Sequence, residues 1–161
     1  MAEGVTPTLR RLLREQKVRR SGISEGMVAK ELEGARNDLR TSHASFEIGN
    51  HKWATVQAYY SMFHSARALL YNRGFREKSH RGLLAALSEL YPKQVTQSML
   101  DAFEEAMLLR ESADYELAYS EEDANNVLES AGKFLDQANR ILKAKAEARR
   151  VRIGQQQSLT K

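Results

Sequence analysis

The chain has 161 residues, of which 42% are hydrophobic and 29% are charged, so it is long enough to bury one hydrophobic core. It contains no cysteine and no apolar run of roughly 18 residues, which excludes disulfides, thiolate metal sites and a membrane span. The net charge of +4 is concentrated in residues 1–20 and 143–161, whereas residues 21–142 carry more acidic than basic side chains, which argues against a uniformly basic nucleic-acid-binding globule.

Residues 8–20 are the first predicted element, a short amphipathic helix within a basic N-terminal extension of residues 1–22. Leucines form one face and cationic side chains surround them: Leu9, Leu12, Leu13, Arg10, Arg11, Arg14, Lys17 and Arg19. Such a helix could contact RNA, lie on a membrane surface or dock on a partner. Alternatively, its leucines rest on the remainder of the protein, because an isolated helix this short is marginal in water.

Two long helices follow, over residues 25–48 and 51–72. Ser24 is a suitable N-cap for the first, and the short turn at Gly49 predicts that the two helices are antiparallel neighbours. The second helix holds the most apolar and aromatic run of the chain, without glycine or proline. Its apolar stripe recurs at three- and four-residue steps, at Trp53, Val56, Tyr60, Phe63 and Leu70. Its adjacent Tyr59 and Tyr60 must face different neighbours, so this helix is predicted to be the centre of an all-α bundle.

The segment after this helix concentrates positive charge. Gly74 is predicted to end the helix in the left-handed conformation, and a loop over residues 75–82 precedes a short helix over residues 83–90. The cationic or titratable side chains of the loop are Arg76, Lys78, His80 and Arg81. They could hold a phosphate beside a helix start, or they could simply be solvated.

A fourth helix is predicted over residues 96–112, followed by an irregular connector to Tyr119 and a final helix to residue 142. Ser120 and Asp123 form a capping box for the final helix. The helical bundle therefore spans residues 23–143, and residues 144–161 are predicted to be a basic, flexible tail. Near the end of the fourth helix, Arg110 could bind a phosphodiester and stabilise the charge that develops on it, or could merely pair with Asp114 four residues on.

The histidines give no further site. His64 is interpreted as a hydrogen-bonded core residue, because it lies within an aromatic helix. Glu77 and His80 form a single Glu-x-x-His pair, whereas a di-iron bundle needs two such pairs and two further glutamates. We therefore predict no metal and no cofactor.

Three segments together resemble the HEPN domain family, in its small stand-alone prokaryotic branch. They are the run Ala58-Tyr-Tyr-Ser-Met-Phe-His-Ser-Ala-Arg-Ala-Leu-Leu70, the segment Lys78-Ser-His-Arg-Gly82 that follows Arg73-Gly74, and the stretch Arg110-Glu-Ser-Ala-Asp-Tyr115. The resemblance covers about residues 25–142. It implies an up-and-down bundle of about five helices that is usually a homodimer. It also implies a frequent partner, a minimal nucleotidyltransferase, in toxin–antitoxin or nucleotide-linked pairs.

Many members of this family are metal-independent endoribonucleases whose motif contains an arginine, a polar residue and a histidine. The resemblance matches Arg110 and Glu111 to the first two positions, but Tyr115 stands where the histidine would be, and no histidine follows His80. A tyrosine with a pKa near about 10 does not exchange a proton at neutral pH as histidine does. The resemblance therefore implies a shared cationic and aromatic cleft for RNA or nucleotide phosphate, in which Tyr115 or Tyr119 could be modified by the partner.

Two hypotheses follow, from different classes. The favoured one is a cytoplasmic binding protein, half of a toxin–antitoxin-like pair, that holds RNA or nucleotide without cleaving it. The other is an active endoribonuclease toxin in which Arg110 polarises the phosphate and His64, His80 or Tyr115 replaces the missing base. A helical scaffold whose basic ends bind is a third possibility. The catalytic candidates are Arg110, Asp114 and Tyr115, and the phosphate-binding candidates are Arg76, Lys78, His80, Arg81 and Tyr119.

Overall fold

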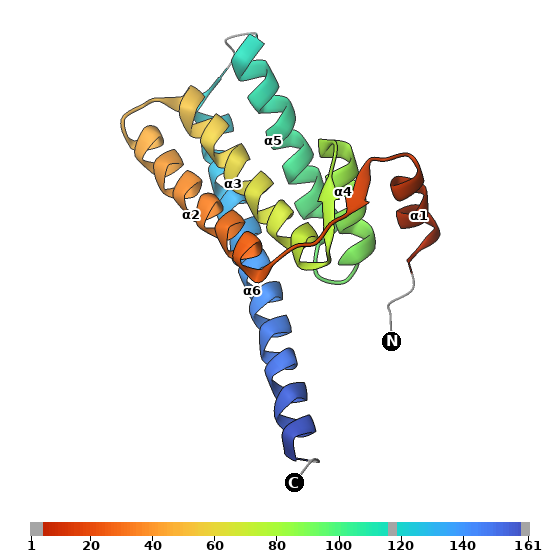
Figure 1. Cartoon of the computed structure of the whole chain (residues 1–161). Coiled ribbons are helices and arrows are strands. Elements are labelled where there is room, and N and C mark those ends of the chain that lie inside the picture. The colour runs from red at the N-terminus through yellow and green to blue at the C-terminus, as the bar shows by residue number, and fades with distance from the viewer. Residues whose placement is uncertain (1–4, 116–118, 159–161) are drawn as a thin grey trace.

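A computed structural model of the chain describes residues 5–115 and 119–158, and the side chains of residues 114 and 115 lie outside that description. Helices dominate the described residues, which confirms the predicted all-α fold (Figure 1). In chain order the elements are α1 (Pro7–Arg14), β1 (Val18–Arg20), α2 (Glu25–Glu47), α3 (His51–Asn72), β2 (Phe75–Glu77), α4 (His80–Leu90), α5 (Gln97–Tyr115) and α6 (Glu121–Ser158).

Helix α3 is the centre of the bundle, as its uninterrupted apolar sequence predicted. It packs against α2, α4, α5 and α6 (Figure 1). Tyr59, Met62 and Leu69 are fully buried along it. Trp53 differs from the prediction: the periodicity placed it in the apolar stripe, but its side chain is 52% exposed. It lies in the first turn of α3, at one end of the bundle, where fewer neighbours surround the helix.

The helix ends follow from local side-chain chemistry. Ser24 Oγ accepts the Met27 amide at 3.3 Å at the start of α2, and Ser120 Oγ accepts the Asp123 amide at 3.0 Å at the start of α6. Gly74 follows α3 with a φ of +78°, which is the left-handed conformation that its sequence position predicted.

Helix α1 packs on α4 through its leucines. Leu9 and Leu12 are each only 3% exposed, so they are not available to a membrane surface. The chain then forms β1, which pairs antiparallel with β2 and places Val18 opposite Glu77. Residues 75–82 were predicted to be a loop, and that prediction is wrong, because this pairing with a distant segment makes residues 75–77 a strand and α4 already begins at His80.

Helix α6 is longer than the sequence predicted. Residues 144–158 were predicted to be a flexible tail, but they continue the helix to Ser158, and their end projects from the bundle (Figure 1). Alanine, lysine, glutamate and arginine, which are strong helix formers, dominate residues 143–150. Arg149 pairs with Glu25 at 2.7 Å near the point where α6 leaves the bundle. Within the described ranges, no helix combines the length and the hydropathy of a membrane-spanning segment.

Candidate functional site

Arg110 of α5 rests on two aromatic rings of α3. Its Cζ atom lies 5.7 Å from the ring centre of Tyr59 and 5.8 Å from that of Tyr60. Its Nη2 also donates a hydrogen bond to Tyr60 Oη at 3.3 Å. The side chain is half-buried. A guanidinium held over aromatic faces keeps its charge and its flat arrangement of N–H donors in a fixed place.

His80 joins the same aromatic cluster from the start of α4. Its Nδ1 lies 2.7 Å from Tyr59 Oη, and its ring centre lies 5.0 Å from that of Phe63. Because Tyr59 is fully buried, its hydroxyl proton needs an acceptor, and the acceptor beside it is His80 Nδ1. We therefore assign Tyr59 as the donor, which places the proton of the neutral His80 ring on Nε2.

Burial and charge keep this pair in that protonation state. Burial lowers the pKa of His80, and the positive charge of Arg110 lowers it further, against smaller effects of Glu77 and Glu111. Burial also raises the pKa of Tyr59, so its hydroxyl stays protonated at neutral pH. The Nε2–H of His80 has no partner among the described residues and is not enclosed. Around one tyrosine ring the protein thus offers a fixed positive charge and a neutral N–H donor, a combination suited to an anion.

The other cationic residues of the 76–81 segment do not meet at this site. Arg76 lies over the ring of Tyr71, with its Cζ 5.0 Å from the ring centre. The side chain of Lys78 is exposed beside the segment that joins α1 to β1. Arg81 is exposed next to His80 on α4. Of the four phosphate-binding candidates in residues 76–81, only His80 contacts the aromatic cluster on which Arg110 rests.

The remaining candidates lie near the end of α5. Asp114 and Tyr115 continue that helix in place of the predicted irregular connector, but their side chains lie outside the described residues. Tyr119 precedes α6 and its side chain is 45% exposed.

A second polar cluster joins α2, α3 and β2. His64 Nδ1 lies 2.7 Å from Glu31 Oε2, and Arg67 lies 3.5 Å from Glu31 Oε1 and 2.9 Å from Glu77 Oε1. His64 is therefore a hydrogen-bonded structural residue, as predicted. Because Glu77 faces Arg67 while His80 faces the aromatic cluster, the single Glu-x-x-His pair is divided. In the part of the chain that the structure describes, no three His, Asp or Glu side chains are placed to hold a metal ion.

Sequence reasoning missed the aromatic residues of the site. Tyr59, Tyr60 and Phe63 were assigned to the core, and the structure shows that they also position Arg110 and His80. Two adjacent tyrosines in the most apolar helix were an available signal, because each buried hydroxyl needs a polar partner from another element.

Comparison with known proteins agrees with this architecture. The HEPN domain matches residues 28–141 of the chain, from the first turn of α2 into α6. The protein named "Putative toxin MJ0605" from Methanocaldococcus jannaschii is 29% identical over 123 residues, which are 70% of this chain and 86% of the relative. A "UPF0332 protein" from Archaeoglobus fulgidus is 31% identical over 103 residues, which are 62% of this chain and 82% of the relative.

A solved structure supports the fold independently. The crystal structure of TT1696 from Thermus thermophilus superimposes with a TM-score of 0.59 and 22% identity, over 70% of this chain and 96% of that one. The family match spans the helices that hold Arg110 and His80. The chain therefore belongs to the HEPN domain family.

Proposed function

We propose that this chain is a toxin-like HEPN protein that binds the phosphate of RNA or of a nucleotide without cleaving it. The relative named as a toxin supports the toxin-like class. The observation that carries the binding site is the placement of Arg110 and of the His80 Nε2–H around Tyr59. Phosphate oxygens accept hydrogen bonds from both kinds of group, and a guanidinium can donate two at once.

The aromatic rings favour a nucleotide over a bare anion. Tyr60 and Phe63 are only partly buried and lie beside the two donors. Nucleobases stack on such rings, which adds about 1–3 kcal/mol per base in single-strand binding sites. A phosphate at Arg110 with a base on an adjacent ring would use both features.

The alternative is the metal-independent endoribonuclease, with Arg110 stabilising the charge that develops on the phosphate. Cleavage also needs a group that accepts a proton near neutral pH. In the assigned tautomer, Nδ1 of His80 already accepts from Tyr59 and Nε2 already carries a proton. The ring is therefore ready to donate a hydrogen bond rather than to remove a proton, which favours binding over cleavage.

The proposal is tested by measuring binding of a fluorescent single-stranded RNA of about 16 nucleotides, and of AMP, in a buffer with EDTA. Arg110→Ala should weaken both affinities by about tenfold to a hundredfold, because it removes charged hydrogen bonds. Arg110→Lys should fall between, because it keeps the charge but loses the planar pair of donors.

The matched control is Arg40→Ala on α2, an exposed arginine that contacts Asn37 of the same helix, and it should bind like the wild type. Unchanged RNA affinity of the Arg110→Ala protein, or no binding by the wild type, would contradict the proposal. Cutting of the RNA in EDTA that disappears in Arg110→Ala would favour the endoribonuclease.

The partner and the assembly are part of the same proposal. We expect a homodimer, which light scattering would detect as twice the chain mass, and a nucleotidyltransferase as the second half of the pair. Tyr119, which is 45% exposed, and Tyr115 are the candidate acceptors. Transfer of a nucleotidyl group from ATP to a phenol oxygen releases pyrophosphate, so mass spectrometry of the chain after incubation with such an enzyme would locate the added group. A chain that stays monomeric and unmodified would contradict this part.

A further inference from the structure

We infer that the phosphate site at Arg110 is one end of a cationic track for the backbone of single-stranded RNA, and that the track runs across the start of α4 and over α1. The inference rests on the proposed function and extends it, because it names a strand of RNA rather than a mononucleotide as the ligand. The track is formed by six exposed side chains: Arg10, Arg11, Arg14, Lys17, Lys78 and Arg81.

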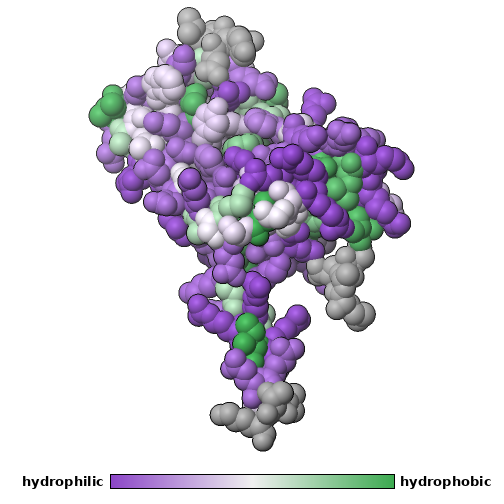
Figure 2. Space-filling view, in the orientation of Figure 1, coloured by the Kyte–Doolittle hydropathy of each residue, from purple (hydrophilic) through white to green (hydrophobic). Residues whose placement is uncertain are grey.

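The outer face of α1 carries half of this charge. Arg10, Arg11 and Arg14 lie on the side opposite the buried leucines and, with Pro7 and Thr8, line a shallow hollow. None of the three arginines forms an ion pair within the described part of the chain. In Figure 2 the region that carries α1 is mainly hydrophilic, with a band of hydrophobic residues beside it. This eight-residue helix extends over about 12 Å, so its arginines can contact successive phosphates.

The fold fixes α1 beside the start of α4. The Lys78 amide donates to the Lys17 carbonyl at 2.9 Å, directly after the pairing of β1 with β2. Gly82 lies so close to this segment that a Cβ atom there would stand 2.5 Å from the Lys17 carbonyl oxygen. The packing therefore holds Lys17, which follows α1, against the first turn of α4, which also holds His80.

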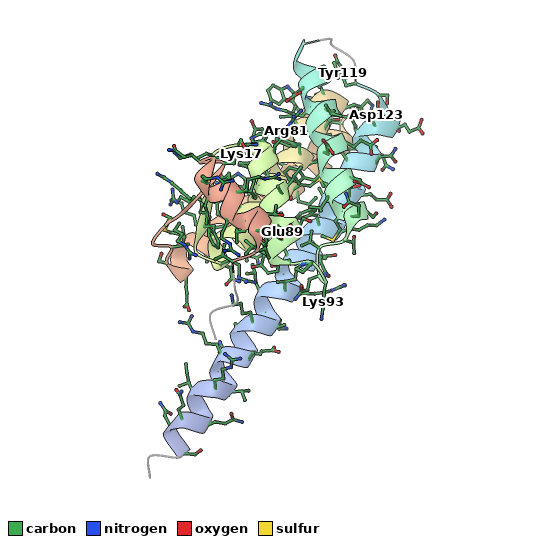
Figure 3. All side chains as sticks on the ribbon, turned by 90° about the vertical axis from the view of Figure 1, so that its right-hand side faces the viewer. Lys17, Arg81, Glu89, Lys93, Tyr119 and Asp123 are labelled. Carbon is green, nitrogen blue, oxygen red and sulfur yellow. The ribbon has the colours of Figure 1, made fainter. Side chains whose placement is uncertain are left out.

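This contact brings cationic residues of the two segments side by side. Lys17 and Lys78 lie at the junction, and Arg81 follows His80 on α4. Figure 3 shows Lys17 and Arg81 on the side that carries α1, with Arg81 nearer the end of the molecule where Tyr119 lies. His80 in turn is hydrogen-bonded to the buried Tyr59, and the guanidinium of Arg110 lies over the Tyr59 ring.

A polyanion fits this surface better than a lipid membrane does. Leu9 and Leu12, which would anchor α1 in a bilayer, are buried against the protein and Leu13 is partly buried, so the helix presents mainly charge to the outside. Arginine donors match phosphate groups along a nucleic-acid backbone. The one acidic side chain between the arginines and Lys17 is Glu15, which pairs with Lys17 at 3.0 Å. Because α1 has no aromatic residue on which a base could stack, we expect it to contact the sugar-phosphate backbone of the RNA, independently of the base sequence.

The test uses the full chain with Arg10, Arg11 and Arg14 all changed to Gln, which leaves Leu9 and Leu12 in place. Affinity for the single-stranded RNA of about 16 nucleotides should fall about tenfold, and the slope of log K against log salt should become shallower by about 2, because three phosphate contacts are lost. Affinity for AMP, which reaches only the Arg110 end, should not change. The matched control changes Lys30, Arg36 and Arg40 of α2 to Gln and so removes the same amount of charge. Its RNA affinity should stay within about twofold of the wild-type affinity, a loss that includes the general effect of the lower net charge.

The outcomes separate this inference from the proposed function. If the α1 variant binds RNA with wild-type affinity and salt slope while Arg110→Ala does not, the track is overturned and the phosphate site stands. If the α2 variant loses as much affinity as the α1 variant, the effect is one of net charge, and the track is again overturned. If the α1 variant loses binding to vesicles with anionic lipid but not to RNA, the surface recognises a membrane instead. No RNA binding by the wild type overturns both proposals.

Discussion

The hydroxyl of Tyr59 is fully buried and lies 2.7 Å from His80 Nδ1, so the state of one proton decides what the histidine can do. Burial lowers the pKa of His80, and the neighbouring charge of Arg110 acts in the same direction. His80 is therefore neutral at pH 7 and presents Nε2–H. A neutral donor beside a guanidinium binds an anion over a wide pH range, whereas a protonated histidine would lose its positive charge as the pH rises.

A second residue-scale prediction concerns Glu31. Burial alone would raise the pKa of Glu31, but the hydrogen bond from His64 and the charge of Arg67 outweigh it, so the pKa lies below the ordinary 4.5. A carboxyl group with a lowered pKa stabilises the folded state above its unfolded pKa, and this stabilisation is lost as the pH falls through the folded value. Glu31→Gln should therefore lower the free energy of unfolding at pH 7 by about 2 kcal/mol.

The pH dependence gives the sharper comparison. Urea unfolding of the wild type should show stability falling below about pH 4.5, and the Glu31→Gln protein should show a flatter curve in that range. The control is Glu33→Gln, because Glu33 is exposed on the same helix. It should change neither the free energy of unfolding at pH 7 nor the dependence of stability on pH. Equal slopes for the wild type and Glu31→Gln would contradict the role of the cluster.

At the scale of elements, the junction between α1, β1 and α4 depends on Gly82. A Cβ atom at this position would stand 2.5 Å from the Lys17 carbonyl oxygen and 3.1 Å from its carbonyl carbon, and both are backbone atoms that cannot rotate away. Gly82→Ala should therefore displace the β1 segment, and should lower the free energy of unfolding by about 1–3 kcal/mol. Hydrogen exchange of the Lys78 amide, which donates to Lys17, should become faster.

Gly132→Ala is the matched control, because a Cβ atom at Gly132 of α6 meets nothing within 4 Å. It should raise the free energy of unfolding by about 0.5–1 kcal/mol, as alanine does in a helix interior. If Gly82→Ala were as stable as Gly132→Ala, the tight contact between α4 and the N-terminal segment would not exist in solution.

The elements differ in how well sequence predicts them. The bounds of α2 and α3, the cap at Ser120 and the left-handed Gly74 follow from side-chain periodicity and local hydrogen bonds, and all were predicted. The strands were not, because Val18 pairs with Glu77 across a long sequence separation that no local pattern encodes. The continued helix of residues 144–158 was missed because its few apolar residues gave no stripe, although its composition favours helix.

The site shows the same division. Arg110 and His80 were both singled out from sequence, one at a helix end and one in a cationic segment. Their connection through Tyr59 joins positions 21 residues apart in one hydrogen bond, and Tyr60 meets Arg110 across 50 residues. Such contacts arise from helix packing, so sequence alone could not show that Arg76 and Lys78 would lie elsewhere.

At the scale of the whole molecule, the structure gives the two basic ends different surroundings. The N-terminal arginines are held on the bundle by the buried leucines of α1, next to the segment that carries His80. The C-terminal basic residues lie on the projecting part of α6, which is mainly hydrophilic with a small hydrophobic patch (Figure 2). Val151 and Ile153 of α6 are 58% and 49% exposed. The N-terminal charge is therefore the part that can act together with Arg110.

The most direct test of the phosphate site is nuclear magnetic resonance of the His80 ring and of the Arg110 side chain in ¹⁵N-labelled protein during titration with AMP at neutral pH. The account predicts that His80 starts with its proton on Nε2, and that the His80 Nε2 and Arg110 Nε signals shift together along one saturating curve. A proton on Nδ1 before AMP is added, or saturating AMP that moves other signals and leaves these two unchanged, would contradict it.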